Sequence, residues 1–408
     1  MPKRLLILCD GFGRPLYGPR MTQLCKHLNQ RGWQITLLTE QIETPQYVVP
    51  GCTFHSMVYY RGGRIRTKIQ WVLDKLFGRK EHTFYRFVRR HIRTSEYDVI
   101  LCSAFNDFPL RTATRIAQET NLPLVVDLRD IAEQWGTDSY MIHHLGMGQI
   151  GKRLTRWYQQ RAIAIRNRAL RVATAVTTVS PWHCQMLRSY NSNVHLIYNG
   201  YDADVFYPAA IPAPTFIISY IGRIYDLTFR NPQILLQAVA ELWQQNLIEQ
   251  QHFRIVFHIE PYIVPVLRDM TQQMGIDCLC HIEGYIPHQE AQKIQQQSAI
   301  SVVLLQAETT QGSHGIMTTK FFEALGCEKP VLCIPSSHGC LAQTIRETHA
   351  GIATANVEEI KTFILEKYHE WQANGYTRQN VQNKEPFSRA YQAQQFETLF
   401  LQCTRQHP

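Results

Sequence analysis

The sequence has little that would suit a membrane-spanning or secreted protein. No apolar run comes near the ~18 residues that a helix needs to cross a bilayer. Residues 1–9 start basic and turn apolar, but the apolar part is too short for a secretory signal, so it predicts a first buried strand. The 11 cysteines are odd in number and scattered, which argues against a disulfide framework and favours a reducing compartment. We therefore expect a cytoplasmic protein.

Metal-ligating residues at useful spacing are also scarce. The run Cys278-Leu279-Cys280-His281 has one residue between its two cysteines, and no second pair lies near it in the sequence. This is poor spacing for zinc in a strand-like stretch. We interpret these residues as part-buried strand thiols and predict no metal site.

The chain has 408 residues, enough for two domains with full cores. Its 45% hydrophobic and 18% charged residues are typical of a globular protein. Short apolar runs alternate with helix-like stretches, as in the series Arg4–Cys9, Arg20–Arg31 and Trp33–Thr39. Such alternation predicts parallel sheets with helices on both faces. The expected fold class is therefore α/β, with doubly wound, Rossmann-like domains.

The alternation is interrupted once, which predicts a domain boundary. It pauses around residues 199–202, and three prolines between residues 208 and 214 then make a stiff connection. We place the domains at residues 1–205 and 206–385. Residues 386–408 are expected to form a final helix that returns to the first domain.

One stretch in the second half, residues 312–326, carries the strongest chemical pattern. It follows the apolar run 300–305, opens with glycines and continues as a helix that ends at Gly326. Lys320 and Glu323 are three residues apart and so share one helix face. A helix start favours an anion and Lys320 adds positive charge, while Glu323 could accept hydrogen bonds from two hydroxyls. This pattern suits the phosphate and ribose of a nucleotide; the alternative is an ordinary solvated ion pair.

Charged residues also follow a strand of the first half. Asp127, Arg129 and Asp130 come at the end of the expected strand Leu124–Leu128. Ligands of doubly wound sheets bind beyond the carboxyl ends of the strands, so these residues are site candidates. The alternative is a local Asp–Arg pair that fixes the loop. The loop Gly11-Phe12-Gly13 lacks the third glycine of the dinucleotide fingerprint, so a plain tight turn explains it equally well.

Positive charge is concentrated in two stretches. The net charge is +9, and residues 61–93 hold 11 Lys or Arg against two acidic residues, with aromatic residues between them. A second basic run covers residues 152–171. Basic residues mixed with aromatics suit an anionic membrane surface or a polyanion, while a solvated helical face is the plain alternative. No nucleic-acid motif accompanies the charge, so we expect no nucleic-acid partner.

Several motifs in order resemble the GT-B glycosyltransferases, and in particular the retaining family-4 enzymes, which transfer sugars from nucleotide donors. The carriers are Asn199-Gly200-Tyr201-Asp202, Tyr220-Ile221-Gly222-Arg223, Ile282-Glu283-Gly284-Tyr285-Ile286-Pro287, and Lys320-Phe321-Phe322-Glu323-Ala324-Leu325 with Lys329-Pro330-Val331. The resemblance covers nearly the whole chain. The segment Asp127-Leu128-Arg129-Asp130 is similar to a subgroup common in surface-polysaccharide assembly. The resemblance implies two Rossmann-like domains facing across a cleft, the first for the acceptor and the second for the nucleotide sugar.

The resemblance also implies roles for residues of the second domain. Arg223 and Lys320 match the pair that binds the donor diphosphate. Glu323 matches the acidic residue that binds the ribose hydroxyls. Tyr285 and Ile286 match a turn that contacts the base, largely through backbone atoms.

Four further positions match less closely. Gly13 matches a loop near the donor diphosphate and the acceptor, and Gly315 and Ile316 lie where backbone N–H groups face the donor sugar and phosphate. Asp130 falls roughly where the family has a polar residue facing the transferred sugar. The family often shows two glutamates separated by seven residues. Here the second is Glu323 but the first position is Gly315, which departs from that pattern.

The implied activity is transfer of a sugar from a UDP- or GDP-sugar to a lipid-linked or polysaccharide acceptor, with retention. Asp130, Arg223 and Lys320 are the expected catalytic residues, and no metal or other cofactor is expected.

The family often has a lysine shortly after the arginine that corresponds to Arg223, whereas the nearest basic residue here is Arg230. Residues 61–93 would attach the enzyme to the inner face of the cell membrane. The alternatives are a nucleotide-sugar epimerase of the same fold and a non-catalytic relative that binds a partner.

Overall fold

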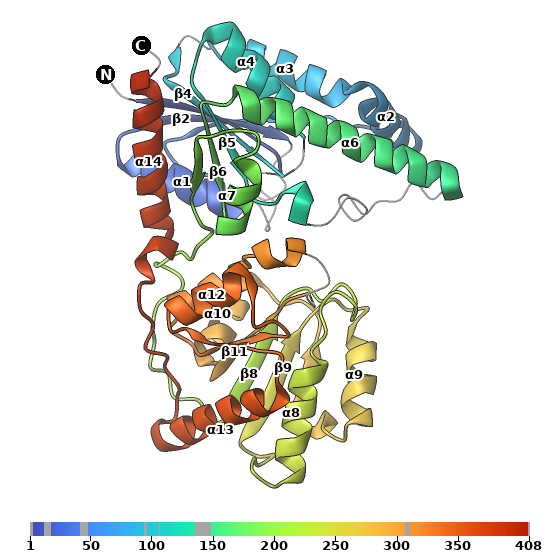
Figure 1. Cartoon of the computed structure of the whole chain (residues 1–408), viewed down its shortest axis with the longest axis vertical. Coiled ribbons are helices and arrows are strands. Elements are labelled where there is room, and N and C mark those ends of the chain that lie inside the picture. Colours follow the sequence, from blue (N-terminus) through green and yellow to red (C-terminus); the bar gives the residue numbers. More distant parts are fainter. Residues whose placement is uncertain are drawn as a thin grey trace. The chain divides into compact units, whose positions relative to one another are not determined.

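The computed structural model describes residues 3–11, 18–40, 48–93, 96–105, 107–134, 148–306 and 311–406. The chain forms two compact units, each with its own parallel sheet (Figure 1). Unit 1 comprises Met1–Tyr198 and Arg389–Pro408, and unit 2 comprises Asn199–Ser388. Among the described residues, no helix is both long enough and apolar enough to span a membrane.

Unit 1 is built around a seven-stranded sheet of order β3-β2-β1-β4-β5-β6-β7 in which all neighbouring strands are parallel. Its elements are β1 (Arg4–Cys9), α1 (Gly18–Gln30), β2 (Gln34–Glu40), β3 (Thr53–Met57), α2 (Arg64–Phe77), α3 (Arg79–His91), β4 (Val99–Ala104), α4 (Leu110–Thr120), β5 (Leu124–Leu128), α6 (Gly148–Val172), β6 (Ala175–Thr178), α7 (Pro181–Leu187), β7 (Val194–Leu196) and α14 (Arg389–Gln406).

Alternate side chains of β1 enter two different cores. Leu5 and Ile7 pack with residues of α1 and α14, whereas Leu6 and Leu8 pack with residues of α3, α4 and α6. Successive side chains of a strand point to opposite faces, so a strand covered on both faces is apolar throughout. The continuous apolar run at the start of the sequence is explained by this double burial.

Helix α14 completes unit 1 although it comes from the end of the chain. It lies beside α1, and its Phe400 meets Trp33 edge-on with ring centroids 5.8 Å apart (Figure 1). The Trp33 indole N–H donates to Glu397 at 3.0 Å. Residues 389–406 therefore cover apolar surface that the first strands and α1 would otherwise expose.

Unit 2 contains a six-stranded parallel sheet of order β10-β9-β8-β11-β12-β13. Its elements are β8 (Phe216–Ile221), α8 (Gln233–Gln244), β9 (Phe253–His258), α9 (Val264–Gln273), β10 (Cys280–Glu283), α10 (His288–Gln297), β11 (Ile300–Leu304), α11 (Thr319–Gly326), β12 (Val331–Ile334), α12 (Gly339–Glu347), β13 (Gly351–Ala353) and α13 (Val357–Asn374). Short 3-10 turns cover Asp277–Leu279, Gln311–Gly315 and Glu385–Phe387.

The expected α/β fold with two Rossmann-like sheets is confirmed. Both basic stretches are helical: residues 61–93 contain α2 and α3, and 152–171 lie within α6. Helix α11 ends at Gly326 as expected. Close packing explains the glycine itself, because a Cβ there would lie 2.7 Å from the Tyr201 ring.

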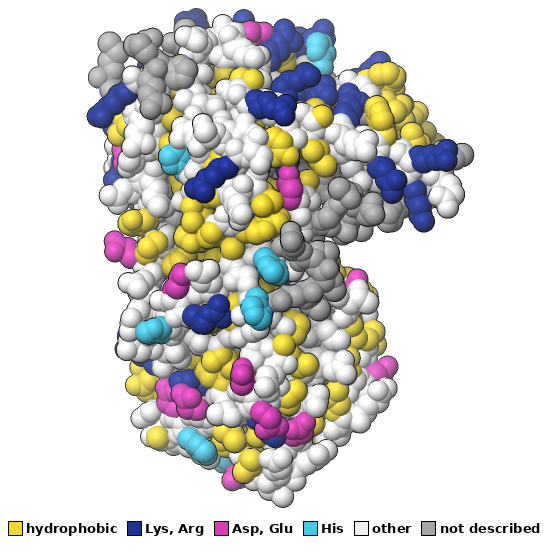
Figure 2. Space-filling view, viewed as in Figure 1, with side chains coloured by type: hydrophobic (Ala, Val, Ile, Leu, Met, Phe, Trp, Pro, Cys, Tyr) yellow, Lys and Arg dark blue, Asp and Glu magenta, His cyan; other side chains and the backbone are white. Residues whose placement is uncertain are grey.

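Figure 2 shows how charge is distributed over one face of the molecule. Lys and Arg side chains gather around hydrophobic ones over α2 and the beginning of α6, whereas unit 2 carries both signs of charge. The basic character of the sequence is therefore largely a property of unit 1.

Candidate functional site

Lys320 and the end of β8 lie against each other at the carboxyl edge of the unit 2 sheet. A Cβ placed on Gly222 would be 2.0 Å from Lys320 Cε and 2.7 Å from its Nζ. Lys320 therefore crosses the backbone directly before Arg223, and glycine is required for this approach. The structure thus brings together Arg223 and Lys320, which the sequence places almost 100 residues apart.

Three cations share this edge, because Arg230 also reaches it. Burial lowers the pKa of Lys320; the nearby Glu323 opposes this shift and the positive charge of Arg230 adds to it. The Arg230 guanidinium donates to the Arg223 carbonyl at 2.6 Å, and the Tyr220 hydroxyl donates to the same oxygen at 2.6 Å. Clustered cations repel one another, and an anion such as a diphosphate would relieve that repulsion.

Arg223 itself is exposed and held by aromatic and acidic neighbours. Its guanidinium carbon lies 5.8 Å from the centre of the Tyr225 ring. Burial alone would lower the pKa of Arg223, but hydrogen bonding to Tyr225 and the nearby Tyr225, Tyr285 and Glu260 groups raise it overall. The side chain therefore stays fully charged at the strand edge.

Glu260, which the sequence analysis missed, ties three strand ends together. It follows β9, is 5% exposed, and accepts the backbone N–H of Ile224 at 2.8 Å and of Tyr225 at 3.4 Å. Tyr285, after β10, lies near Glu260 and Arg223, and burial together with the Glu260 charge raises its pKa. An acidic residue directly after the expected strand Phe253–Ile259 was the signal available in the sequence.

The remaining unit 2 candidates lie on the loop before α11 and on that helix. Glu323 is half-buried one turn after Lys320, on the same face. Gly315 is buried at the end of a 3-10 turn. The Ile316 N–H bonds to the Ser313 carbonyl at 3.3 Å, so it is already used within the turn. Tyr285 is 55% exposed and Ile286 half-buried in the loop after β10.

In unit 1, Asp127 has a structural role. It is fully buried and pairs with Arg20 at 2.9 Å, and it accepts hydrogen bonds from Ser103 at 3.0 Å and Thr177 at 2.8 Å. Burial opposes ionisation, but the Arg20 charge and these hydrogen bonds outweigh it, so the pKa of Asp127 is lowered. Asp127 is therefore held by a buried ion pair with Arg20 of α1, which is not the local Asp–Arg pair given as the alternative.

Arg129 and Asp130 lie at the same sheet edge of unit 1. Arg129 pairs with Asp10, at the end of β1, at 3.3 Å. Asp130 accepts from the Gln134 amide at 3.4 Å, and Gln134 in turn contacts the ring of the buried His183 at 2.7 Å. Burial raises the pKa of Asp130, while Arg129 and Gln134 oppose the shift. Asp130 thus remains available as a polar group at the sheet edge; Gly13 lies outside the described residues.

Acidic and thiol groups offer little to a metal ion. Within the described ranges, no three His, Cys, Asp or Glu side chains come together in a way that could hold one. Asp202-Ala203-Asp204 has the Asp-x-Asp spacing that the sequence analysis passed over, but the Asp202 carboxylate accepts the backbone N–H of Asp204 at 3.1 Å as part of a turn. Burial raises the pKa of Cys280 to about 12, so its thiol stays protonated.

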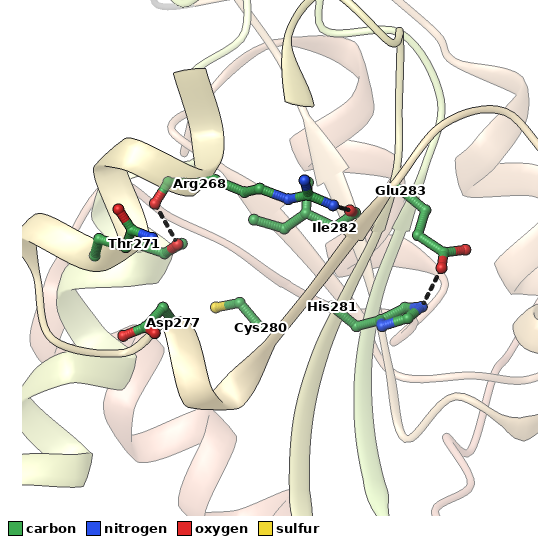
Figure 3. Close-up of a pocket in the computed structure, with 8 residues that line it drawn as sticks. Arg268, Thr271, Asp277, Cys280, His281, Ile282 and Glu283 are labelled. Atoms are coloured by element: carbon green, nitrogen blue, oxygen red, sulfur yellow. Dashed lines mark hydrogen bonds and ion pairs between the residues drawn. The ribbon is translucent and has the colours of Figure 1, made fainter. Parts of the chain in front are cut away.

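An open pocket of about 220 Å³ lies elsewhere in unit 2, between α9 and the edge strand β10 (Figure 3). Arg268 spans it and donates to the Ile282 carbonyl at 3.0 Å, and His281 lies 3.1 Å from Glu283. None of the expected donor-binding residues lines it. The pocket therefore adds nothing to the site at the sheet edge.

Comparison with known proteins shows what the first half of the chain is similar to. Residues 19–205 match the family described as Glycosyltransferase Family 4. This stretch resembles the family-4 glycosyltransferases. No curated protein matches the chain.

Solved structures share the fold of this chain over nearly its full length. Sucrose-phosphate synthase from Thermosynechococcus elongatus is 17% identical with a TM-score of 0.65, over 98% of this chain and 99% of that one. Anabaena HepE in complex with UDP and glucose is 15% identical with a TM-score of 0.64, over 98% and 100% of the two chains. A Listeria monocytogenes protein described as a putative UDP-N-acetylglucosamine 2-epimerase is 11% identical with a TM-score of 0.57, over 100% and 98%. These similarities confirm the GT-B fold, and the resemblance to family-4 glycosyltransferases is confirmed.

Proposed function

We propose that this chain transfers a sugar from a nucleoside-diphosphate donor to an acceptor. The observation that carries the proposal is the cluster of Arg223, Arg230 and Lys320 at the carboxyl edge of the unit 2 sheet, with Glu323 one helical turn beyond Lys320. Such an edge is where doubly wound sheets bind nucleotides. The solved HepE, which has a similar fold, was in complex with UDP and glucose.

In this proposal the cations act on the leaving group. Negative charge develops on the diphosphate as the bond to the sugar breaks, and fixed positive groups aimed at it lower the barrier. Arg223 and Lys320 supply that charge, and we add Arg230 because it lies close enough to affect the pKa of Lys320. We further propose that the sugar is transferred with retention and that a phosphate oxygen assists deprotonation of the acceptor.

The other expected residues take binding roles. Glu323 accepts the ribose hydroxyls, and the turn of Tyr285 and Ile286 contacts the base of a UDP- or GDP-sugar. Gly315 contributes backbone close to the donor sugar. The Ile316 N–H could donate to the donor sugar or phosphate only after its 3.3 Å hydrogen bond to the Ser313 carbonyl breaks.

Unit 1 would take the acceptor. Asp130 is proposed to face the transferred sugar, and Gly13 to lie near the diphosphate and the acceptor. We propose a glycan or lipid-linked acceptor, and a cytoplasmic enzyme that works at the inner membrane surface. All 11 cysteines are free thiols, which fits a reducing compartment.

An epimerase is the second candidate function, because a protein described as an epimerase shares the fold. It would convert a nucleotide sugar without any acceptor. The family match of residues 19–205 favours the transferase. Incubating UDP- and GDP-sugars with the protein alone separates the two, since only an epimerase would yield an isomeric nucleotide sugar.

The deciding experiment measures binding before activity. UDP and GDP are titrated into the full chain and into Arg223→Ala, Lys320→Ala and, as a control on an exposed lysine of α10, Lys293→Ala. We expect a tight nucleoside diphosphate to raise the melting temperature of the wild type and Lys293→Ala, by about 2.7 kcal/mol of stability at a hundredfold excess over Kd. Failure of the wild type to bind any nucleoside diphosphate would favour the non-catalytic alternative.

A further inference from the structure

Helix α2 presents an apolar stripe to solvent. Ile65, Ile69, Val72 and Leu76 follow one another at spacings of four, three and four residues, which places them on one helix face. They are between 41% and 78% exposed, and the adjoining Phe77 is 66% exposed. Single exposed apolar residues are ordinary, but an aligned set of this size marks an interaction surface.

Basic residues border this stripe on both sides. Arg64 and Lys68 lie along one side and Arg66 along the other, and all three are exposed. The helix has one acidic residue, Asp74, whose carboxylate accepts the Lys80 backbone N–H at 2.9 Å. The exposed face therefore combines a hydrophobic centre with a positive border.

Helix α6 extends the same surface, although the sequence treats it as a separate basic run. Its Arg161 donates to the carbonyl of Leu76, which joins the first half of α6 to the end of α2. Leu154 and Trp157 are 37% and 45% exposed there, and the Arg161 guanidinium lies 5.4 Å from the centre of the Trp157 ring. Figure 2 shows the resulting patch, in which basic side chains surround hydrophobic ones.

We infer that α2 and the first half of α6 form a membrane-binding surface, in which the α2 stripe and Trp157 enter the acyl boundary of an anionic bilayer while the flanking Arg and Lys contact its phosphates. A helix with an apolar face, basic flanks and an aromatic residue beside it is suited to the interface plane of a bilayer. The inference deepens the proposed function and rests on it, because a membrane-binding surface would bring the enzyme to a lipid-linked acceptor. Its test measures membrane binding and does not use the transfer reaction.

The structure narrows the expectation made from residues 61–93. Phe84 is fully buried in the core of unit 1, so it cannot touch a membrane, and Tyr85 bonds to Glu119 at 2.8 Å. Within the expected stretch 61–93, the contact surface is therefore narrowed to α2, and it gains the first half of α6. The phosphates of a nucleic acid would bind the cations, but they would make no favourable contact with the apolar stripe of α2.

The first arm of the test removes apolar contacts. The full chain is floated with vesicles of phosphatidylcholine alone or mixed with phosphatidylglycerol. Ile65→Ser with Ile69→Ser is compared with a control pair on unit 2, Leu247→Ser with Val266→Ser, whose side chains are 45% and 43% exposed. We expect the wild type and the control pair to float with the anionic vesicles, and the α2 pair to bind at least tenfold more weakly.

The second arm removes charge. Each Lys or Arg near an anionic leaflet contributes roughly fivefold in affinity, so Arg64→Gln with Lys68→Gln should weaken binding by about thirtyfold. The matched control is Arg89→Gln with Arg90→Gln, two exposed arginines on α3. Quenching of Trp157 by brominated lipid, read as the difference between wild type and Trp157→Phe, reports insertion directly.

The outcomes distinguish a membrane from a second copy of the chain or a nucleic acid as the partner of this surface. Loss of flotation in both α2 pairs, with unchanged UDP or GDP binding and melting temperature, supports the inference even if no transfer activity is found. Equal flotation of wild type and α2 pairs overturns it. So does a dimer in light scattering that the α2 pairs abolish in the absence of vesicles, or preferential binding of an oligonucleotide over the anionic vesicles.

Discussion

Lys320 lies across Gly222, so closely that a methyl group at position 222 would be 2.0 Å from its Cε. Helix α11 and strand β8 meet at this contact, and it sets the position of a cation beside Arg223. The side chain is long and flexible, so it can move aside at little cost to the fold. That makes position 222 a means of displacing the charge while leaving the lysine in the sequence.

Gly222→Ala is therefore expected to impair nucleotide binding more than stability. The added methyl group forces Lys320 away from the backbone before Arg223, so we expect UDP or GDP to bind at least tenfold more weakly, while strain at the φ of +159° lowers the melting temperature moderately. Isothermal titration and thermal unfolding measure the two effects. Gly63→Ala is the control, because a Cβ there meets no atom within 4 Å. Unchanged nucleotide binding in Gly222→Ala would show that Lys320 does not contribute to the nucleotide site.

Glu260 is expected to act by positioning the loop that carries Arg223. Glu260→Ala leaves the N–H groups of Ile224 and Tyr225 without their acceptor, at a cost of about 1–3 kcal/mol for a buried group. Glu260→Gln keeps one acceptor oxygen and should recover most of that stability. We expect the alanine variant to raise the KM for the donor more than it lowers kcat. Equal KM values in all three proteins would contradict the positioning role.

Asp127 is expected to matter for stability. Removing one partner of a buried ion pair costs about 3–5 kcal/mol, so Asp127→Ala should unfold at a clearly lower urea concentration. The control is Glu96→Ala, since the exposed pair between Arg4 and Glu96 is worth only about 0–1 kcal/mol. If Asp127→Ala kept wild-type stability but lost transfer, Asp127 would belong to the site after all.

His183 gives a pH dependence whose sign follows from its burial. Burial lowers the pKa of His183 from 6.5 to about 4, with Glu133 opposing the shift. The unfolded chain therefore binds a proton on His183 more tightly than the folded chain does. The contribution of the neutral, buried His183 to the free energy of unfolding is accordingly lost as the pH falls from 6.5 towards 4. In His183→Gln the free energy of unfolding should fall less steeply over that range. Parallel curves from urea titrations would show that the histidine is not buried.

Removal of metal ions tests the chemistry of the leaving group. If Arg223, Arg230 and Lys320 carry the diphosphate charge, transfer should proceed at an unchanged rate after treatment with EDTA. The measurement is the initial rate of product formation with and without added Mg²⁺ or Mn²⁺. A rate that depends on the divalent ion would show that a metal, and not these side chains, neutralises the charge of the leaving group.

The sequence predicts those parts of the site that depend on local spacing. Lys320 and Glu323 share a face because a helix fixes their separation, and Arg223 lies at a sheet edge because it directly follows an apolar strand. Glu260 also directly follows a strand, but its role could not be predicted from that position, since its partners are N–H groups at the end of another strand. Asp127 shows the same limit: its partner Arg20 is 107 residues away in the sequence and becomes a neighbour only when the sheet forms.

The return of α14 to the beginning of the chain has a consequence for biosynthesis. Unit 2 is continuous in sequence, whereas unit 1 needs its last helix to cover Trp33. During translation, unit 2 can therefore finish folding while the first-made half still exposes the apolar side chains that α14 covers, until residues 389–406 have left the ribosome. Nascent chains stalled before residue 389 should accordingly be the aggregation-prone species of this protein.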